Sequence, residues 1–139
     1  MNSDIRTVLA DHGLRATTPR LAVFAALANT ATPLSVADII KICPKVDKVS
    51  IYRTIEVFTR IEVVTIVMHG WKQRYELAEP FKPHHHHLHC TACGMVLETH
   101  SDQIEHLINA ISDKHEFHPI AHTFEITGLC RACATRQAN

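Results

Sequence analysis

Apolar side chains recur every three or four residues through the N-terminal part of the chain, up to Arg60, which is the spacing of amphipathic helices. In the last of these segments Ile51, Ile55 and Phe58 share one face. Residues able to cap a helix precede most of the segments. The pattern therefore predicts four short helices, which begin near Ser3 or Asp4, at Pro19, at Ser35, and at Asp47 or Ser50.

The pattern changes to that of strands after the fourth helix. Residues 63–68 and 73–77 predict two strands joined by a turn at His69 and Gly70, and helices followed by such a hairpin favour a winged helix-turn-helix. Pro80 and Pro83 indicate a hinge. Farther along, residues 95–99 and 121–127 predict strands, and residues 102–115 predict a helix. We expect an α+β chain with a winged-helix domain at 1–78, a hinge at 79–83 and a small α/β domain at 84–139.

Charge is distributed unevenly between the two halves. The formal net charge is zero, but residues 1–78 carry ten basic and seven acidic side chains, whereas residues 79–139 carry four and seven. Ten of the 12 histidines also lie in the second half. A mildly basic half joined to an acidic, histidine-rich half indicates one part that faces a polyanion and another that faces a cation.

Length and composition exclude several classes of protein. The 139 residues, 46% of them hydrophobic and 20% charged, suit one compact domain or two small ones. No run approaches the roughly 18 apolar residues of a membrane span. Residues 1–10 contain no basic start followed by an apolar run, so no secretory signal is visible. We therefore expect a cytoplasmic protein without a membrane partner.

Four of the five cysteines form two close pairs, Cys90 with Cys93 and Cys130 with Cys133. A C-x-x-C turn lets both sulfurs reach one ion, and Zn²⁺ takes four ligands in a tetrahedron. Two independent redox pairs fit less well, because neither pair follows a strand in a βαβ pattern. The sequence predicts a structural zinc site with four cysteine ligands, whereas Cys43 is expected to be a small buried apolar residue.

A run of four histidines supplies a second set of metal donors. Side chains alternate along an extended segment, so His84 and His86 point one way while His85 and His87 point the other. One run is thus able to serve two ions, and imidazole with carboxylate suits Zn²⁺, Fe²⁺ or Mn²⁺. A solvated histidine-rich linker is the alternative. Further nitrogen and oxygen donors are present at Glu76, Glu98, His100, Glu105, His118 and His122.

Three segments and the last cysteine pair together resemble the ferric uptake regulator (Fur) family of bacterial metal-sensing repressors. The segments are GLRATTPR at residues 13–20, VSIYRT at 49–54 and HHHHLHCTACG at 84–94. The resemblance extends over residues 5–133, and the order and spacing of the segments make it specific.

The resemblance implies a homodimer that binds double-stranded DNA at an inverted repeat and represses genes of metal uptake or homeostasis. The second domain would then be the dimerisation domain. Tyr52 and Arg53 match the recognition-helix pair, and a half-buried core aromatic is the alternative for Tyr52. The full set that matches the family's DNA contacts is Arg15, Thr18, Arg20, Tyr52 and Arg53.

The resemblance also implies two metal sites besides the structural zinc. A site within the dimerisation domain matches His84, His86, Glu105 and His122. A sensor site at the domain junction matches Glu76, His85, His87 and Glu98. The family usually adds a ligand from the first domain, but Thr32-Pro33-Leu34 offers none here, which leaves His69 as an alternative ligand.

The regulatory metal is open between Zn²⁺ and Fe²⁺, with Mn²⁺ as a further option. An all-histidine run is common in the zinc-sensing (Zur) branch, but zinc sensors often have Cys at the position of Glu76. The peroxide-sensing branch usually has Asp at the positions of Glu76 and Glu98, so the glutamates here argue against that branch. A peroxide or manganese sensor is kept as the alternative within the family.

An enzyme is the alternative from another class, either a zinc-dependent hydrolase or a deaminase. A deaminase needs His-x-Glu with Pro-Cys-x-x-Cys, and neither cysteine pair follows a proline. The His-Glu-x-x-His motif of zinc proteases is also missing from the sequence. We therefore expect no enzymatic activity. A metal store or chaperone would explain the histidines but not the first 78 residues.

Overall fold

The computed structural model describes residues 4–138, so the alternative cap Ser3 lies outside the described residues. The chain divides into two compact units, one ending at Pro83 and the other beginning at His84. Among residues 4–138, no helix combines the length and apolar character needed to cross a bilayer.

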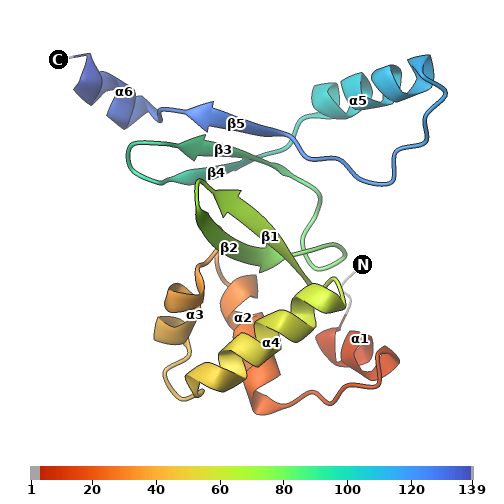
Figure 1. The fold of residues 1–139 in the computed structure, drawn as a ribbon, viewed down its shortest axis with the longest axis vertical. Helices are drawn as coiled ribbons and strands as arrows, with labels where there is room; N and C mark the ends of the chain where they lie inside the picture. The colour runs from red at the N-terminus through yellow and green to blue at the C-terminus, as the bar shows by residue number, and fades with distance from the viewer. Residues whose placement is uncertain (1–3, 139) are drawn as a thin grey trace. The chain divides into compact units, whose positions relative to one another are not determined.

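The first unit consists of four helices followed by a hairpin (Figure 1). The two strands are antiparallel, with Val64 opposite Leu77 and His69 opposite Lys72. The order of helices and hairpin is that of a winged helix, as predicted. The elements are α1 (Ile5–Asp11), α2 (Thr18–Ala28), α3 (Val36–Ile42), α4 (Lys48–Arg60), β1 (Val64–His69) and β2 (Lys72–Leu77).

One buried side chain or more from each helix meets in the core of this unit. Leu9 of α1, Val23 of α2 and Ile39 of α3 are fully buried, as are Ile51 and Phe58 of α4. These side chains occupy the apolar faces that the helical spacing predicted. Their burial fixes the orientation of α4, whose opposite face is left exposed.

Side-chain caps define where the helices begin. Asp47 Oδ1 accepts a hydrogen bond of 2.9 Å from the Ser50 backbone N–H, which selects Asp47 as the cap of α4. Asp4 caps α1 in the same way. At α3 the Ser35 hydroxyl accepts from the Asp38 N–H at 3.1 Å, while Asp38 Oδ2 accepts from the Ser35 N–H at 3.0 Å. These two reciprocal bonds form a complete capping box.

The second unit is a three-stranded sheet with two helices. The strand order is β4-β3-β5, in which β3 runs antiparallel to β4 and parallel to β5. With the helical first unit this confirms the α+β class. The elements are β3 (His86–Cys90), β4 (Val96–Thr99), α5 (Asp102–Lys114), β5 (Glu125–Gly128) and α6 (Arg131–Gln137).

Two details of this unit differ from those predicted from the sequence. A strand was expected at 121–127. The strand found there, β5, begins only at Glu125, because Glu125 is the first residue that pairs with β3, opposite His87. The final helix α6 was not predicted. Its seven residues include Cys133, which was predicted to bind metal but was not assigned to a helix or strand.

The capping box of α3 provides a test of local stability. The hydrogen bond from Ser35 lowers the pKa of Asp38, so the stabilisation is present above the ordinary value of 3.8 and is lost as the pH falls through the lower folded-state value. Ser35→Ala should lower the free energy of unfolding by about 1 kcal/mol at neutral pH. Urea denaturation measures the effect, and Ser35→Thr, which keeps the hydroxyl, should retain most of the stability. An equal loss in both variants would contradict the cap.

Candidate metal sites and DNA-binding surface

The four paired cysteines converge at one end of the second unit. Cys90 ends β3, Cys130 caps α6 and Cys133 lies in its first turn, while the positive φ of Gly94, 74°, allows the tight turn after Cys93. The four sulfurs lie within 4.8 Å of one another, and Cys93 Sγ is 3.9 Å from Cys130 Sγ. Sulfurs bound to one tetrahedral zinc would be about 3.8 Å apart. The set therefore fits a zinc ion without rearrangement of the backbone.

Hydrogen bonds make the four thiols unequal. The backbone N–H of Cys130 donates to Cys90 Sγ at 3.3 Å, and this bond is the main reason that the pKa of Cys90 falls to about 6. The pKa of Cys133 rises to about 11, chiefly through its interaction with the Cys130 side chain, although Arg136 Nη2 donates to Cys133 Sγ at 3.1 Å. The Cys90 thiol therefore ionises more readily than that of Cys133, and a bound cation would displace the thiol protons that remain.

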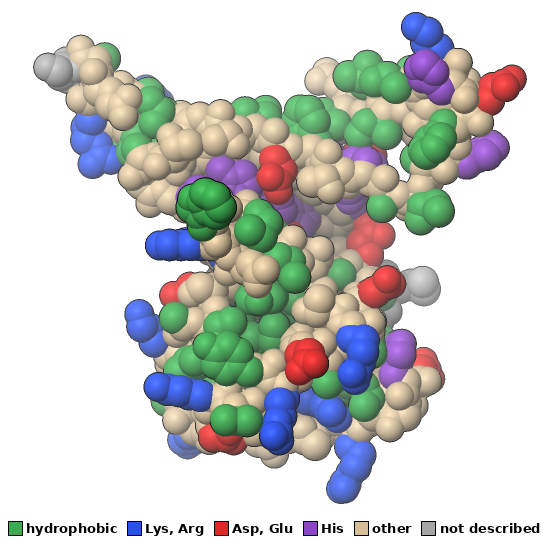
Figure 2. Space-filling model, viewed as in Figure 1, with side chains coloured by type: hydrophobic (Ala, Val, Ile, Leu, Met, Phe, Trp, Pro, Cys, Tyr) green, Lys and Arg blue, Asp and Glu red, His purple; other side chains and the backbone are tan. Residues whose placement is uncertain are grey.

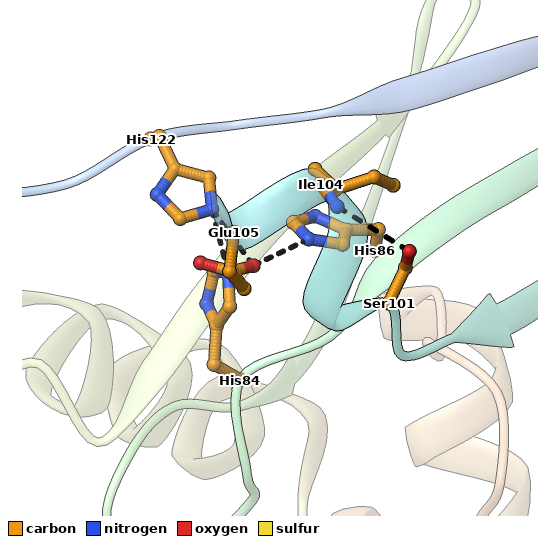
Figure 3. Close-up of polar contacts among 6 residues, drawn as sticks. All are labelled: His84, His86, Ser101, Ile104, Glu105 and His122. Atoms are coloured by element: carbon orange, nitrogen blue, oxygen red, sulfur yellow. Dashed lines mark hydrogen bonds and ion pairs between the residues drawn. The ribbon is translucent and has the colours of Figure 1, made fainter. Parts of the chain in front are cut away.

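Four donors from three parts of the second unit surround one point (Figure 3). His86 begins β3 and His84 lies two residues before it, Glu105 lies in the first turn of α5, and His122 precedes β5. Glu105 Oε1 is 2.8 Å from His86 Nε2, 3.4 Å from His84 Nε2 and 3.3 Å from His122 Nε2. The Ser101 hydroxyl caps α5 by accepting from the Ile104 N–H, which sets the position of Glu105.

The carboxylate at the centre of this group is held ionised. The hydrogen bond from His86 is the largest cause of the lowered pKa of Glu105, and His122 and His84 lower it further. His84 Nε2 and His122 Nε2 are 2.9 Å apart, so one of these nitrogens must donate while the other accepts. Three imidazole nitrogens and one carboxylate oxygen that face the same point fit a divalent first-row metal ion.

The opposite face of β3 carries the other two histidines of the run. His85 Nε2 is 3.2 Å from His87 Nε2 and 3.9 Å from Glu98 Oε1, and Glu98 lies across from His87 in the β3–β4 pairing. The alternation predicted for the run therefore holds. Glu76 lies on β2 of the first unit, where Lys82 Nζ contacts its Oε2 at 3.0 Å, and His69 ends β1 of that unit.

A further group on this face was missed by the sequence analysis. His89 follows His87 on the same side of β3, with 5.9 Å between their ring centroids, and its Nε2 is 3.7 Å from Glu125 Oε1. Glu125 lies across from His87 in the parallel pairing with β5. One donor atom from each of the three residues lies within 4.8 Å of the others. The spacing of His87 and His89 was visible in the sequence, but the neighbouring carboxylate was not.

The remaining donors that the sequence suggested lie apart from these sets. The His100 ring centroid is 6.0 Å from that of His85, and among the described residues His118 joins none of the four groups. Cys43 is buried, and its pKa is raised by that burial, as expected for a thiol that acts as an apolar side chain.

Tyr52 and Arg53 both lie on the exposed face of α4. Tyr52 is 57% exposed, so the alternative of a half-buried core aromatic is wrong. Their neighbours Ile51 and Thr54 point inward and are buried. The core thus presents the two side chains to solvent on a rigid helix, as recognition of a DNA groove requires.

Basic side chains border a concavity between α2 and α4. Its volume is about 320 Å³, and Arg20, Arg53 and Arg60 contribute to its lining. Arg20 Nη1 donates to the Arg15 carbonyl oxygen at 2.6 Å, which ties the loop before α2 to the helix that Thr18 begins. Figure 2 shows that Lys and Arg side chains are frequent on the face of the first unit that carries α4, with a few acidic side chains among them.

The sequence is similar to those of known proteins. The ferric uptake regulation protein of Yersinia pestis is 30% identical over 141 residues, which cover 97% of this chain and 94% of that protein. The ferric uptake regulation protein of Campylobacter jejuni subsp. jejuni is 33% identical over 90 residues, which cover 64% of this chain. That match spans 56% of the length of the Campylobacter protein.

Solved structures share the fold. The Helicobacter pylori ferric uptake regulator Fur, described with three functional metal binding sites, matches with a TM-score of 0.81 at 26% identity, over 94% of this chain and 89% of that one. The Vibrio cholerae ferric uptake regulator, described with rearranged DNA-binding domains, matches with a TM-score of 0.76 at 28% identity, over 91% and 100%. The model of the Ferric uptake regulator family matches residues 11–127. The chain is therefore a member of the ferric uptake regulator family.

Proposed function

We propose that this protein is a metal-responsive, DNA-binding transcriptional repressor of metal uptake or homeostasis genes. The observation that carries the proposal is that Glu105 and three imidazoles converge on one point. The helix α4 of the same chain carries the exposed Tyr52 and Arg53. Ferric uptake regulators are regulators of metal uptake, and one relative is described with three functional metal binding sites. The donor groups of this chain supply the chemistry for the same kind of response.

The cysteine group is assigned a structural role and the histidine groups a regulatory one. Four thiolates bind Zn²⁺ tightly and close a loop that contains β4, α5 and β5, so zinc there would stabilise the second unit. His84, His86, Glu105 and His122 would hold Zn²⁺ or Fe²⁺, with Mn²⁺ as a further option. The mixed nitrogen and oxygen donors suit all three ions.

The recognition helix α4 is assigned to the major groove of DNA. Tyr52 and Arg53 would contact base edges and the adjoining backbone, because both are exposed on one rigid helix. Arg15, Thr18 and Arg20, around the start of α2, would contact phosphates. Guanidinium groups around the concavity between α2 and α4 supply positive charge at that place.

A second copy of the chain is proposed to cover the apolar surface of the second unit. Leu97 and Ile126, which flank Leu88 across the sheet, are 49% and 47% exposed. Leu107 on α5 is 58% exposed, and Figure 2 shows hydrophobic side chains on the surface of this unit. Large apolar side chains left exposed on one unit would be covered if that unit formed an interface. The two-fold axis of a homodimer would match an inverted-repeat operator.

A sensor site is proposed to take ligands from both units. Glu76 belongs to the first unit, while His85, His87 and Glu98 belong to the second, and His69 of the first unit is an alternative ligand. A metal ion that binds residues on both sides of the hinge at 79–83 favours one arrangement of the winged helix over others. Such differential binding is what a ligand needs in order to shift a conformational equilibrium.

The structural role of the cysteines predicts the behaviour of Cys93→Ser. The variant should lose about one zinc per chain and unfold at a lower temperature, because the loop between the two cysteine pairs is no longer closed. Metal analysis and thermal unfolding measure both effects, with Cys43→Ser as the control that keeps its zinc. Full zinc content and an unchanged unfolding temperature in Cys93→Ser would disprove the assignment.

The role of α4 predicts selective loss of DNA binding. Tyr52→Ala and Arg53→Ala should lose operator affinity while their metal content stays unchanged. If Arg53 contacts a phosphate, its loss reduces the slope of log affinity against log salt by about 0.9. Fluorescence anisotropy with labelled DNA at several salt concentrations measures both quantities. Arg6→Ala on α1 is the control, and wild-type affinity in Arg53→Ala would exclude this helix as the reader.

The sensor proposal predicts different responses from two histidine variants. The ratio of DNA affinities with and without metal should fall in His87→Ala by a factor of about 5 to 150, the usual range of coupling between two sites. His122→Ala should act more through dimer stability, because its partners all lie within the second unit. DNA affinity at fixed salt and sedimentation analysis distinguish the two effects. A wild-type metal response in His87→Ala would move the sensor role to the other histidine group.

A further inference from the structure

We propose that His87, His89 and Glu125 form a further divalent-cation site, distinct from the three metal sites assigned above. It lies entirely within the second unit and shares one ligand, His87, with the proposed sensor site. This assignment concerns metal binding alone, so it stands or falls independently of the proposed role in transcription.

The backbone brings these three residues together on one face of the sheet. His87 and His89 are two positions apart on β3, and side chains at that spacing point to the same face. β5 runs parallel to β3 and places Glu125 directly across from His87. Both imidazoles are therefore anchored on the central strand, and the carboxylate is anchored on its neighbour.

The separation of the donors matches a metal site better than a direct hydrogen bond. His89 Nε2 and Glu125 Oε1 are 3.7 Å apart, beyond the usual 2.7–3.2 Å of an N–H···O bond. Two donors on one tetrahedral Zn²⁺, with bonds of about 2.0–2.1 Å, are about 3.3 Å apart. A shift of a few tenths of an ångström in the glutamate side chain would therefore bring these two donors to that spacing.

The two histidines of this group are buried and the glutamate is partly exposed, which suits a metal site that an ion can reach from solvent. His87 and His89 are buried, with 7% and 5% of their surfaces exposed, so their rings are held in place by the surrounding sheet. The side chain of Glu125 is 34% exposed, which gives an ion a path from solvent. Two imidazoles and one carboxylate suit Zn²⁺, Fe²⁺ or Mn²⁺ and leave one coordination position or more for water.

His87 cannot serve two ions through the same nitrogen. Its Nε2 lies 3.2 Å from His85 Nε2, on the side of the proposed sensor site, and one of its two ring nitrogens lies within 4.8 Å of the His89 and Glu125 donors. An imidazole nitrogen has one lone pair, so an ion bound with His89 and Glu125 through Nε2 would withdraw His87 from the sensor set. If both ions use Nε2 the two sites compete for metal, whereas binding through Nδ1 would allow His87 to bridge them.

Nitrogen-15 NMR of the histidine rings tests the site directly. The sample is the full-length protein with zinc already bound at the four cysteines. Zn²⁺ is added at free concentrations set by a chelator buffer, and the Nε2 resonance of His89 is followed. We expect this resonance to shift as zinc binds. In Glu125→Gln the shift should require at least about tenfold more free zinc, since even loss of a residue behind a ligand costs about 10- to 100-fold. Glu116→Gln, which alters an exposed glutamate outside the four groups, should behave like the wild type.

Two further observations make the experiment decisive. His84 and His122 report on the neighbouring site in the same spectra, so a shift of their resonances without any shift of His89 would disprove the proposal. Glu98→Gln removes the carboxylate on the His85 side and should leave zinc binding at His89 unchanged or tighter. Equal weakening in Glu98→Gln and Glu125→Gln would contradict the separate site, because both carboxylates would then serve one ion. DNA binding does not enter this readout.

Discussion

Alternation of side chains along β3 is the constraint on which the metal chemistry of this protein depends. Successive residues of an extended segment point to opposite faces, so in β3 and the two residues before it His84 and His86 reach Glu105 while His85 and His87 face the other way. A shift of β3 by one residue against its neighbours would exchange the two faces. Every imidazole would then lose the carboxylate beside it. The pairing of three short strands thus determines which residues are able to share an ion.

The neighbours of β3 each supply a carboxylate to a different histidine. Glu98 comes from β4, Glu105 from α5 and Glu125 from β5. Ionisable groups in a sheet of this kind are costly to bury unless they are paired or bind a metal. Metal binding and the stability of the second unit should therefore be coupled, and the four cysteines would add to this coupling because a zinc ion bound by them would fasten the end of β3 to α6.

Local signals in the sequence predicted most of the first unit but less of the second. The capping residues Ser35 and Asp47 and the apolar face of α4 were visible because helix formation depends on residues a few positions apart. The direction of the side chains in the histidine run followed from the period of a strand. The late start of β5 and the placement of Glu125 beside His87 were not predictable, because a parallel pairing between distant segments leaves no local pattern.

Anomalous X-ray diffraction from crystals loaded with Zn²⁺, collected on both sides of the zinc absorption edge, tests the central claim most directly. If the alternation of β3 separates the metal sites, the maps will show one peak among the four cysteines and another among His84, His86, Glu105 and His122. A further peak will lie on the opposite face of the strand, with His87 as a ligand. A single histidine-bound ion that takes ligands from both faces of β3, or no ion at any histidine, would contradict the account.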